Sequence, residues 1–207
     1  MDVVIQLRNV SYEYTGGFSL FDKEKKYSPF RNVNFDIYKG ECLGIEGRNG
    51  AGKSTLLRII AGILKPTCGE IRNYGFSTAL LSLGLAFDPN VSGRKNTILY
   101  LMLTGFSKKI AESIAEEVKD FSDLNDFFEK PVKFYSSGMR ARLGFSVMIN
   151  TNADVLLIDE ALAVGDSGFR KKSNAKMLEK VKSGSTVVLV SHNKNDINLL
   201  CDRSIKL

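Results

Sequence analysis

The sequence predicts an α/β fold built on a parallel β-sheet. Two fully apolar runs, 155–158 and 186–190, are separated by the helical segment 167–182. Fully apolar strands that alternate with helices are typical of a parallel sheet that is covered on both faces. A third observation is the glycine-rich segment 47–55, which lies between an apolar run and a helical run. In such a sheet we expect a ligand site at the carboxyl ends of the strands.

Ahead of the glycine-rich segment, the pattern indicates a small β lobe. Apolar and polar residues roughly alternate from Val3 to Tyr14, and a second strand-like piece runs from Val33 to Tyr38. The stretch 15–31 between them carries two glycines, a charge cluster and a proline. It predicts a long irregular excursion that is either functional or loosely ordered.

Beyond the glycine-rich segment, helical and extended patterns alternate. The spacing predicts the strand 42–45 directly before the segment and a helix over 54–63 after it. A short extended pair follows around 70–74 and 78–83, and the periodicity is then mostly helical from about 92 to 148.

Length and composition exclude several protein classes. A chain of 207 residues can bury a substantial core, as one large domain or two small lobes. The three cysteines Cys42, Cys68 and Cys201 are odd in number and widely spaced among apolar residues, which favours reduced core thiols over disulfides or a metal site. The N-terminus lacks the layout of a signal peptide, and no apolar run approaches the roughly 18 residues that span a bilayer. We therefore expect any membrane role to come through a partner.

The charge is basic but dispersed. A formal net charge of +6 and a pI near 9.2 would permit attraction to nucleic acid or to an anionic membrane leaflet. The lysines, however, occur in short scattered groups that suit ordinary solvated surfaces. No nucleic-acid partner is expected.

The segment 47–55 has the spacing G-x-x-x-x-G-K-[ST] of a phosphate-binding loop. Its glycines let successive backbone N–H groups point at phosphate oxygens, and the following helix offers the positive end of its dipole to the same anion. We expect Lys53 to reach the β- and γ-phosphates of a nucleoside triphosphate, and the Ser54 hydroxyl to hold Mg²⁺. The candidate binding residues of the loop are Gly47, Arg48, Asn49, Gly50, Ala51, Gly52, Lys53, Ser54 and Thr55.

An acid pair follows the apolar run 155–158. Asp159 can hold hydrated Mg²⁺, and Glu160 can polarise a water for in-line attack on the γ-phosphate. Acid pairs after strands also occur as helix caps. The phosphate loop upstream favours the catalytic interpretation.

The only histidine, His192, follows the apolar run 186–190. A neutral imidazole there could hydrogen-bond the γ-phosphate or orient the attacking water, although a lone histidine is more often structural. All three loops should open onto the same edge of the sheet. We therefore expect Lys53, Glu160 and His192 to form the catalytic group.

A second candidate anion site lies at 135–140, where a hydroxyl, a glycine and free N–H groups open the helical run that ends at Met148. Taken alone, this pattern also suits an ordinary capped helix. One nucleotide needs only one phosphate cradle. A second cradle raises the possibility that another copy of the protein completes the site.

Taken in this order, the four elements resemble the ATP-binding subunit of an ABC transporter, and the resemblance covers essentially the whole chain. It implies a P-loop NTPase of the RecA-like type that binds ATP and Mg²⁺. Its parallel-sheet core, with an antiparallel N-terminal β lobe, would comprise residues 1–88 and 152–207. A helical subdomain of about residues 89–151 would be inserted into that core.

The resemblance also assigns roles to residues. The loop 47–55 would be Walker A, Asp159 and Glu160 would close Walker B, and His192 would be the switch histidine. Tyr14 would stack on adenine, with Tyr12 as the fallback. The signature motif, usually written LSGGQ, and the D-loop aspartate would be represented by Tyr135, Ser136, Ser137, Gly138, Met139 and Asp166. In this family two subunits sandwich two ATP molecules between one copy's Walker A and the other's signature, which implies a homodimer with twofold symmetry.

The sequence resembles, more narrowly, the exporters of bacterial surface polysaccharides such as O-antigen, capsule and teichoic acid. The segments that carry this resemblance are 47–50, 80–89, 93–96, 135–139 and 160–166. This implies an ATPase that is peripheral on the cytoplasmic face of the bacterial cytoplasmic membrane and works a separate permease for a lipid-linked glycan. An ABC ATPase for a lipid, drug or nutrient is one alternative. A soluble ABC ATPase that acts on nucleic acid or the ribosome is another.

The chain departs from the family pattern at several positions. The only glutamine is Gln6, so the usual Q-loop glutamine is missing, and Leu83 stands near its expected place. Ser137 replaces the first signature glycine, and Met139 replaces the signature glutamine. Glu46 is an unusual acid for a buried strand. The apolar stretch 98–103 is a candidate contact for the permease, with plain helical core as the alternative.

Overall fold

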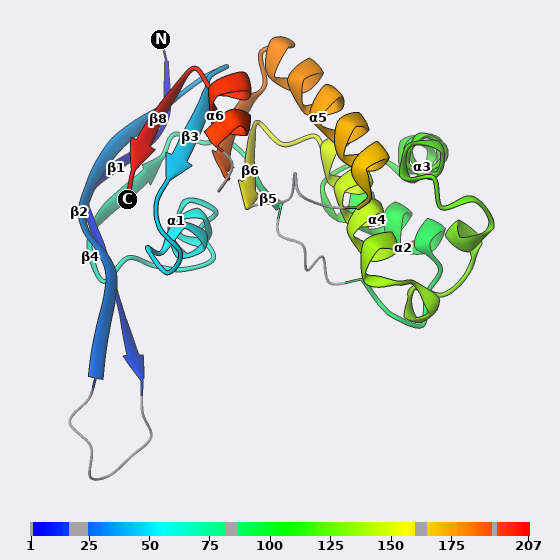
Figure 1. Ribbon diagram of the computed structural model, residues 1–207, viewed down its shortest axis with the longest axis horizontal. Coiled ribbons are helices and arrows are strands. Elements are labelled where there is room, and N and C mark those ends of the chain that lie inside the picture. The colour runs from blue at the N-terminus through cyan, green and yellow to red at the C-terminus, as the bar shows by residue number, and fades with distance from the viewer. Residues whose placement is uncertain (1, 17–24, 82–86, 160–164, 192–193) are drawn as a thin grey trace.

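Two β-sheets make up one end of the molecule, and a group of helices makes up the other (Figure 1). The computed structural model describes residues 2–16, 25–81, 87–159, 165–191 and 194–207. The predicted α/β fold with a parallel sheet and a separate antiparallel β lobe is confirmed.

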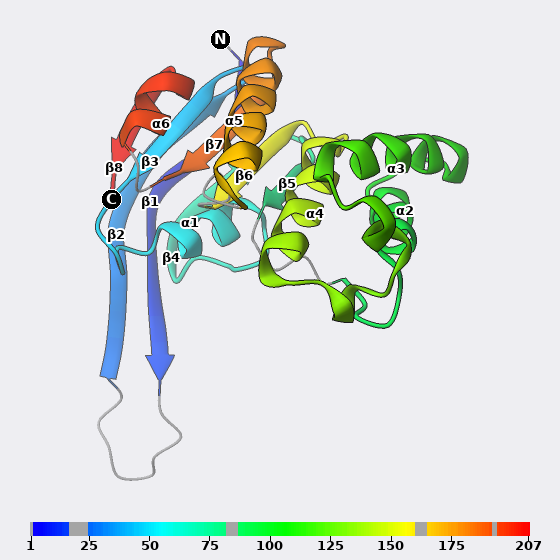
Figure 2. The same ribbon diagram turned by 45° about the vertical axis from the view of Figure 1, so that its right-hand side comes forward.

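The antiparallel sheet has three strands in the order β2-β1-β4. They are β1 (Val3–Gly16), β2 (Lys25–Tyr38) and β4 (Cys68–Asn73). The far ends of β1 and β2 form a long hairpin that projects away from the rest of the molecule (Figures 1 and 2).

The hairpin corrects the prediction of an irregular excursion over 15–31. Residues 25–31 are part of β2, and residues 17–24 lie outside the described residues. A proline interrupts the sequence pattern, but β2 is an edge strand, where the missing N–H of Pro29 costs no pairing. Register shifts along the β1–β2 pair also blur the alternation of apolar and polar residues.

The parallel sheet has five strands in the order β5-β6-β7-β3-β8. Their bounds are Thr78–Leu81 for β5, Val155–Asp159 for β6, Thr186–Val190 for β7, Cys42–Glu46 for β3 and Arg203–Lys206 for β8. The extended pair predicted around 70–74 and 78–83 is divided between the sheets, because β4 pairs with β1 whereas β5 pairs with β6.

The predicted helical segments are present, although the helix expected over 54–63 ends at Ile60 and the helix Lys194–Leu200 was not predicted. The helices near the sheets are α1 (Lys53–Ile60), α5 (Ser167–Lys182) and α6 (Lys194–Leu200). The predicted helical stretch contains α2 (Gly93–Leu103), α3 (Lys108–Ser122) and α4 (Ser137–Ile149), with short 3₁₀ turns at Asn125–Glu129 and Val132–Phe134. Of the described helices, none is long and apolar enough to cross a membrane.

Three hydrophobic clusters make up the interior. Side chains alternate along β6, so Leu157 points into a first cluster with α1 and the antiparallel sheet, whereas Leu156 points into a second cluster with α4 and α5. A third cluster lies among the helices α2, α3 and α4 and includes Phe128 and Leu143. Because α4 contributes to both the second and the third cluster, it joins the helical part to the sheet.

The cysteines fit the prediction only in part. All three thiols are free. Cys42 is buried and Cys201 is partly buried, but Cys68 is exposed on β4, so the expectation of a core position is wrong there. Its strand covers little of the core and keeps most of its residues exposed.

Candidate functional site

A cavity of about 490 Å³ lies where the phosphate-binding loop meets the β1–β2 hairpin. The loop and the first turn of α1 contribute one wall, and the hairpin contributes the other. The described lining residues are Tyr14, Tyr27, Pro29, Asn49, Gly50, Gly52, Lys53, Ser54 and Thr55.

Backbone conformation explains the glycines of the loop. Gly50 and Gly52 have φ angles of +80° and +90°, a left-handed region that favours glycine. A Cβ atom at Gly52 would also lie 2.7 Å from side-chain atoms of both Pro29 and Phe30. The sequence therefore needs glycine at Gly52 both for its turn and for the close approach of the hairpin.

Lys53 supplies a positive charge at the end of this loop. It is the first residue of α1 and is only 5% exposed. Its Nζ donates hydrogen bonds to the carbonyl oxygens of Gly47 (2.9 Å) and Arg48 (3.1 Å). The same short segment thus supplies a nearly buried ammonium group and the N-terminus of α1, a combination suited to the phosphates of a nucleotide.

A carboxylate lies two strands away along the same sheet edge. Val190 at the end of β7 pairs with Ile45 of β3 on one side and with Asp159 of β6 on the other. Asp159 Oδ1 is buried and has no hydrogen-bond partner among the described residues. A buried carboxylate oxygen is costly unless it is paired or binds a cation.

These donors fit Mg²⁺. The ion commonly binds one or two protein oxygens together with phosphate oxygens and water, so a cluster of several acids is not required. Ser54 would offer its hydroxyl from the cavity wall, and Asp159 would offer its buried Oδ1. Among the described residues, there is no group of three or more His, Cys, Asp or Glu side chains that could hold a metal ion.

The two remaining catalytic candidates, Glu160 and His192, lie outside the described residues. Each follows the last described residue of its segment by one position. Glu160 comes after Asp159 at the carboxyl end of β6, and His192 comes after Ser191, which follows β7. The Ser191 hydroxyl donates a hydrogen bond of 3.1 Å to Asp196 in the first turn of α6.

Of the two candidates for stacking on adenine, Tyr14 and Tyr12, only Tyr14 lines the cavity. The hydroxyl of Tyr14 lies 2.6 Å from Thr55 Oγ1. Tyr12, the fallback, packs against the first hydrophobic cluster and is not among the lining residues.

Sequence reasoning missed two lining residues of the hairpin, Tyr27 and Pro29. Both fall in the stretch that was expected to be irregular. A signal was present, because a strand of about twelve residues from Val3 to Tyr14 needs a partner longer than the six residues from Val33 to Tyr38.

The five residues of the signature candidate lie elsewhere, around the start of α4, and none lines the cavity. Ser136 caps the helix, since its Oγ accepts a hydrogen bond of 3.1 Å from the backbone N–H of Met139. Ser136 and Ser137 are exposed, and Gly138 is half-buried. The N-terminus of α4, capped by Ser136, is therefore exposed at the surface.

Tyr135 differs from its neighbours because its side chain is buried. Its hydroxyl donates a hydrogen bond of 2.7 Å to the carbonyl oxygen of Phe127. Burial raises the pKa of Tyr135 to about 12, so the phenol stays protonated at physiological pH. Its side chain is part of the third hydrophobic cluster.

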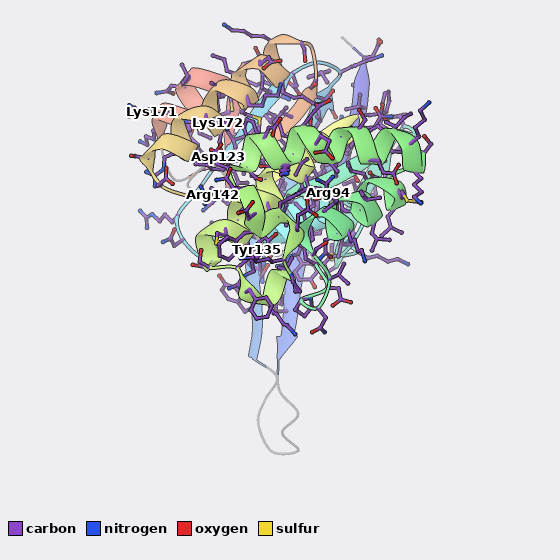
Figure 3. All side chains as sticks on the ribbon, turned by 90° about the vertical axis from the view of Figure 1, so that its right-hand side faces the viewer. Arg94, Asp123, Tyr135, Arg142, Lys171 and Lys172 are labelled. Atoms are coloured by element: carbon purple, nitrogen blue, oxygen red, sulfur yellow. The ribbon has the colours of Figure 1, made fainter. Side chains whose placement is uncertain are left out.

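Asp166 caps α5. Its Oδ1 accepts a hydrogen bond of 2.9 Å from the backbone N–H of Phe169, and this bond lowers the pKa of the Asp166 carboxyl. Arg142 of α4 lies 3.9 Å away from its other oxygen. A second ion pair, between Lys172 of α5 and Asp123 after α3, has its charged atoms 3.0 Å apart (Figure 3). Both ion pairs tie α5 to the helical part.

Glu46 is explained by its position near the edge of the sheet. It is half-buried, and its Oε1 accepts a hydrogen bond of 2.6 Å from the hydroxyl of Ser204 on the edge strand β8. Leu83, near the expected Q-loop position, lies outside the described residues.

The stretch 98–103 divides into two faces of α2. Leu99, Met102 and Leu103 are exposed, and Leu103 is 86% exposed. Leu101 is fully buried, and Tyr100 packs against the third cluster. The helix thus contributes both to the core and to an apolar surface.

Comparison with known proteins gives consistent matches. A family model for the ABC transporter matches residues 30–163. The chain is 44% identical over 88% of its length to the ABC transporter protein AbcA of Aeromonas salmonicida. It is 42% identical over 88% to the O-antigen export system ATP-binding protein RfbB of Klebsiella pneumoniae, and 43% identical over 89% to the teichoic acids export ATP-binding protein TagH of Lactococcus lactis. It spans 59%, 74% and 39% of these relatives, respectively.

A solved structure supports the fold. The chain superimposes, with a TM-score of 0.83 and 24% identity, on the ATP-binding cassette MJ0796 in a dimeric post-hydrolysis state bound to ADP and Pi. The match covers 98% of this chain and 94% of that one. With a family match over residues 30–163 and relatives above 40% identity over nearly nine-tenths of its length, this chain belongs to the ABC transporter family as an ATP-binding domain.

Proposed function

We propose that this chain is the ATP-hydrolysing domain of an exporter for a lipid-linked surface polysaccharide, such as O-antigen, capsule or teichoic acid. The observation that carries the ATPase part is the cavity at the phosphate loop, with Asp159 on the same sheet edge and its buried Oδ1 without a hydrogen-bond partner among the described residues.

In the proposed reaction the loop binds the triphosphate and Lys53 neutralises its β- and γ-oxygens. Mg²⁺, held by Ser54 and Asp159, would neutralise charge that develops on the phosphates. Glu160 accepts a proton from the water whose oxygen forms the new bond to the γ-phosphorus, while the bond to the ADP oxygen breaks. His192 orients this water or the γ-phosphate.

The proposal includes a homodimer. The capped N-terminus of α4 faces outward and is absent from the cavity lining. A second copy, related by a twofold axis, would therefore bring its residues 135–139 to the γ-phosphate side and place Asp166 at the interface. Residues 1–88 and 152–207 would act as the core and about 89–151 as the helical subdomain, and the separate third hydrophobic cluster supports this division.

The polysaccharide cargo rests on the relatives, whose names refer to O-antigen and teichoic acid export. A membrane permease would be the second partner, and it would hold the protein on the cytoplasmic face of the cytoplasmic membrane. The exposed apolar face of α2 (Leu99, Met102 and Leu103) is the candidate contact.

The ATPase is tested by Glu160→Gln, which keeps the shape of the side chain and removes its basicity. We expect unchanged ATP binding and hydrolysis slowed by about 10²- to 10⁴-fold, because a positioned general base is lost. With ATP bound and not consumed, the variant should also dimerise, as measured by light scattering after gel filtration.

Lys53→Ala is the control that should lose nucleotide binding itself. Hydrolysis by Glu160→Gln at a rate near that of the wild type would contradict the assignment of the base. Failure of the wild-type protein to bind ATP at all would contradict the proposed function.

A further inference from the structure

We propose that Tyr27 is a second aromatic residue of the nucleotide site, with two tasks. Its hydroxyl positions the phosphate loop through the carbonyl of Gly50, and its ring closes the end of the cavity that receives the base. The proposal rests on ATP binding as proposed above, and it assigns a role to a residue of the hairpin that no sequence motif identified.

The positioning task follows from one hydrogen bond. The Tyr27 hydroxyl donates to the carbonyl oxygen of Gly50, 2.7 Å away. Gly50 is in the left-handed region, at the turn of the loop. Because glycine has the most conformational freedom of all residues, an external bond to its peptide reduces the number of conformations that the loop can adopt.

Tyr14 makes the matching contact at the other end of the loop. Its hydroxyl lies 2.6 Å from Thr55 Oγ1 in the first turn of α1. Tyr14 and Tyr27 are directly paired in the β1–β2 register, so both side chains project from the same face of the hairpin. The hairpin thus contacts the loop at Gly50 and at Thr55, with Pro29 and Phe30 against Gly52 between them.

The base-binding task follows from the chemistry of the cavity. Lys53 and the N-terminus of α1 occupy one wall and suit the anionic part of a ligand. Tyr14 and Tyr27, whose ring planes are 19° apart and whose ring centroids are 6.4 Å apart, form the aromatic part of the lining. Tyr27 is 54% exposed, so its ring has surface left for a flat heterocycle such as a purine.

Two probes separate the two tasks. ATP carries a base, whereas inorganic tripolyphosphate carries only the phosphates. Tyr27→Phe removes the bond to Gly50 and keeps the ring, and Tyr27→Leu removes both. Affinities would be measured by calorimetry in the presence of Mg²⁺. Tyr74→Leu, at an exposed tyrosine that does not line the cavity, is the matched control.

For Tyr27→Phe we expect both ligands to bind about 2- to 10-fold more weakly, since one hydrogen bond to the loop is lost. For Tyr27→Leu we expect the same loss for tripolyphosphate. We expect a further loss of about 5- to 100-fold for ATP alone, because base stacking is lost as well. Tyr74→Leu should bind both ligands like the wild type.

The outcomes are distinguishable. Wild-type affinity for ATP in Tyr27→Leu would overturn the inference and leave the proposed function intact. Equal losses for ATP and tripolyphosphate in Tyr27→Leu would overturn the base-binding task and keep the positioning task. Loss of all binding in Lys53→Ala would show that both probes report on the phosphate loop, and absence of binding by the wild type would overturn the proposed function instead.

Discussion

In the phosphate loop, Gly52 and Lys53 have different roles, one through its backbone conformation and the other through its charge. Gly52 combines a left-handed backbone with space for Pro29 and Phe30, whereas Lys53 supplies a nearly buried positive charge. The spacing predicted a glycine and a lysine of a phosphate-binding loop at these two positions, but not the contact of Gly52 with the hairpin or the burial of Lys53. It missed Tyr27, because hydrogen bonding to Gly50 depends on the hairpin register and not on any local motif.

The three thiols predict an order of alkylation. Cys68 is exposed, whereas Cys42 is buried with its Sγ 3.4 Å from Cys201 Sγ. The contact with Cys201 and burial raise the pKa of Cys42, and only a thiolate reacts readily. We expect iodoacetamide at pH 8 to modify Cys68 first and Cys42 only after unfolding in guanidinium, as followed by peptide mass spectrometry. Equal rates for both thiols in the folded protein would contradict this order.

Among the elements, α2 and α4 each serve two purposes. In α4, the N-terminus carries the signature candidate, and the rest of the helix packs in two hydrophobic clusters. In α2, Tyr100 and Leu101 pack toward the interior, whereas Leu99, Met102 and Leu103 form an exposed apolar face. The sequence left helical core and permease contact as alternatives for 98–103, and the helix has both a buried face and an exposed apolar face, of which the latter stays a candidate contact.

The buried and exposed faces of α2 determine which residues are suitable for testing the permease contact. Tyr100 is partly buried and packs against the third cluster, so a charge there would disturb the packing of the helices. Leu103→Glu and Leu99→Glu instead place the charge in exposed positions. We expect these variants to sediment with native membranes several-fold less than the wild type, while ATP hydrolysis in solution is unchanged.

Ile110→Glu provides the control, since it places the same charge at an exposed apolar residue of the neighbouring helix α3. Undiminished membrane association of the Leu103 and Leu99 variants would contradict the role of this face. So would an equal loss in Ile110→Glu.

The whole molecule combines a sheet core with a helical part that has its own hydrophobic cluster (Figure 1). The sheet brings residues from distant parts of the chain to one edge, because β3, β7 and β6 are neighbours although about 110 residues separate β3 from β6. Helix α4 and the ion pairs of Arg142 and Lys172 link the two parts.

Because the helical part has its own hydrophobic cluster, we expect a mutation there to lower the stability of the protein without changing its affinity for ATP. Phe128 is fully buried in the third cluster, and Phe128→Ala should lower the free energy of unfolding by about 3–5 kcal/mol, as measured by urea titration. The neighbouring Phe127 is 38% exposed, and Phe127→Ala should cost roughly 1 kcal/mol or less.

Because the cavity is built from β1, β2, the loop and α1, folded Phe128→Ala should still bind ATP with wild-type affinity. A similar stability loss in both phenylalanine variants would contradict the assignment of the cluster. A parallel loss of ATP affinity would show that the two parts are not separable.

The sequence by itself determined the fold class, the strands 155–158 and 186–190 with the helix between them, and the glycine spacing of the phosphate loop, because these depend on short-range periodicity and on residues a few positions apart. Only the tertiary structure decided that 25–31 is an edge strand, that Tyr27 and Pro29 line the cavity, and which face of α2 is exposed. Strand register and packing are relations between residues far apart in the chain. Local propensity does not contain them, and a proline or a bulge on an edge strand hides the alternation that would otherwise indicate a strand.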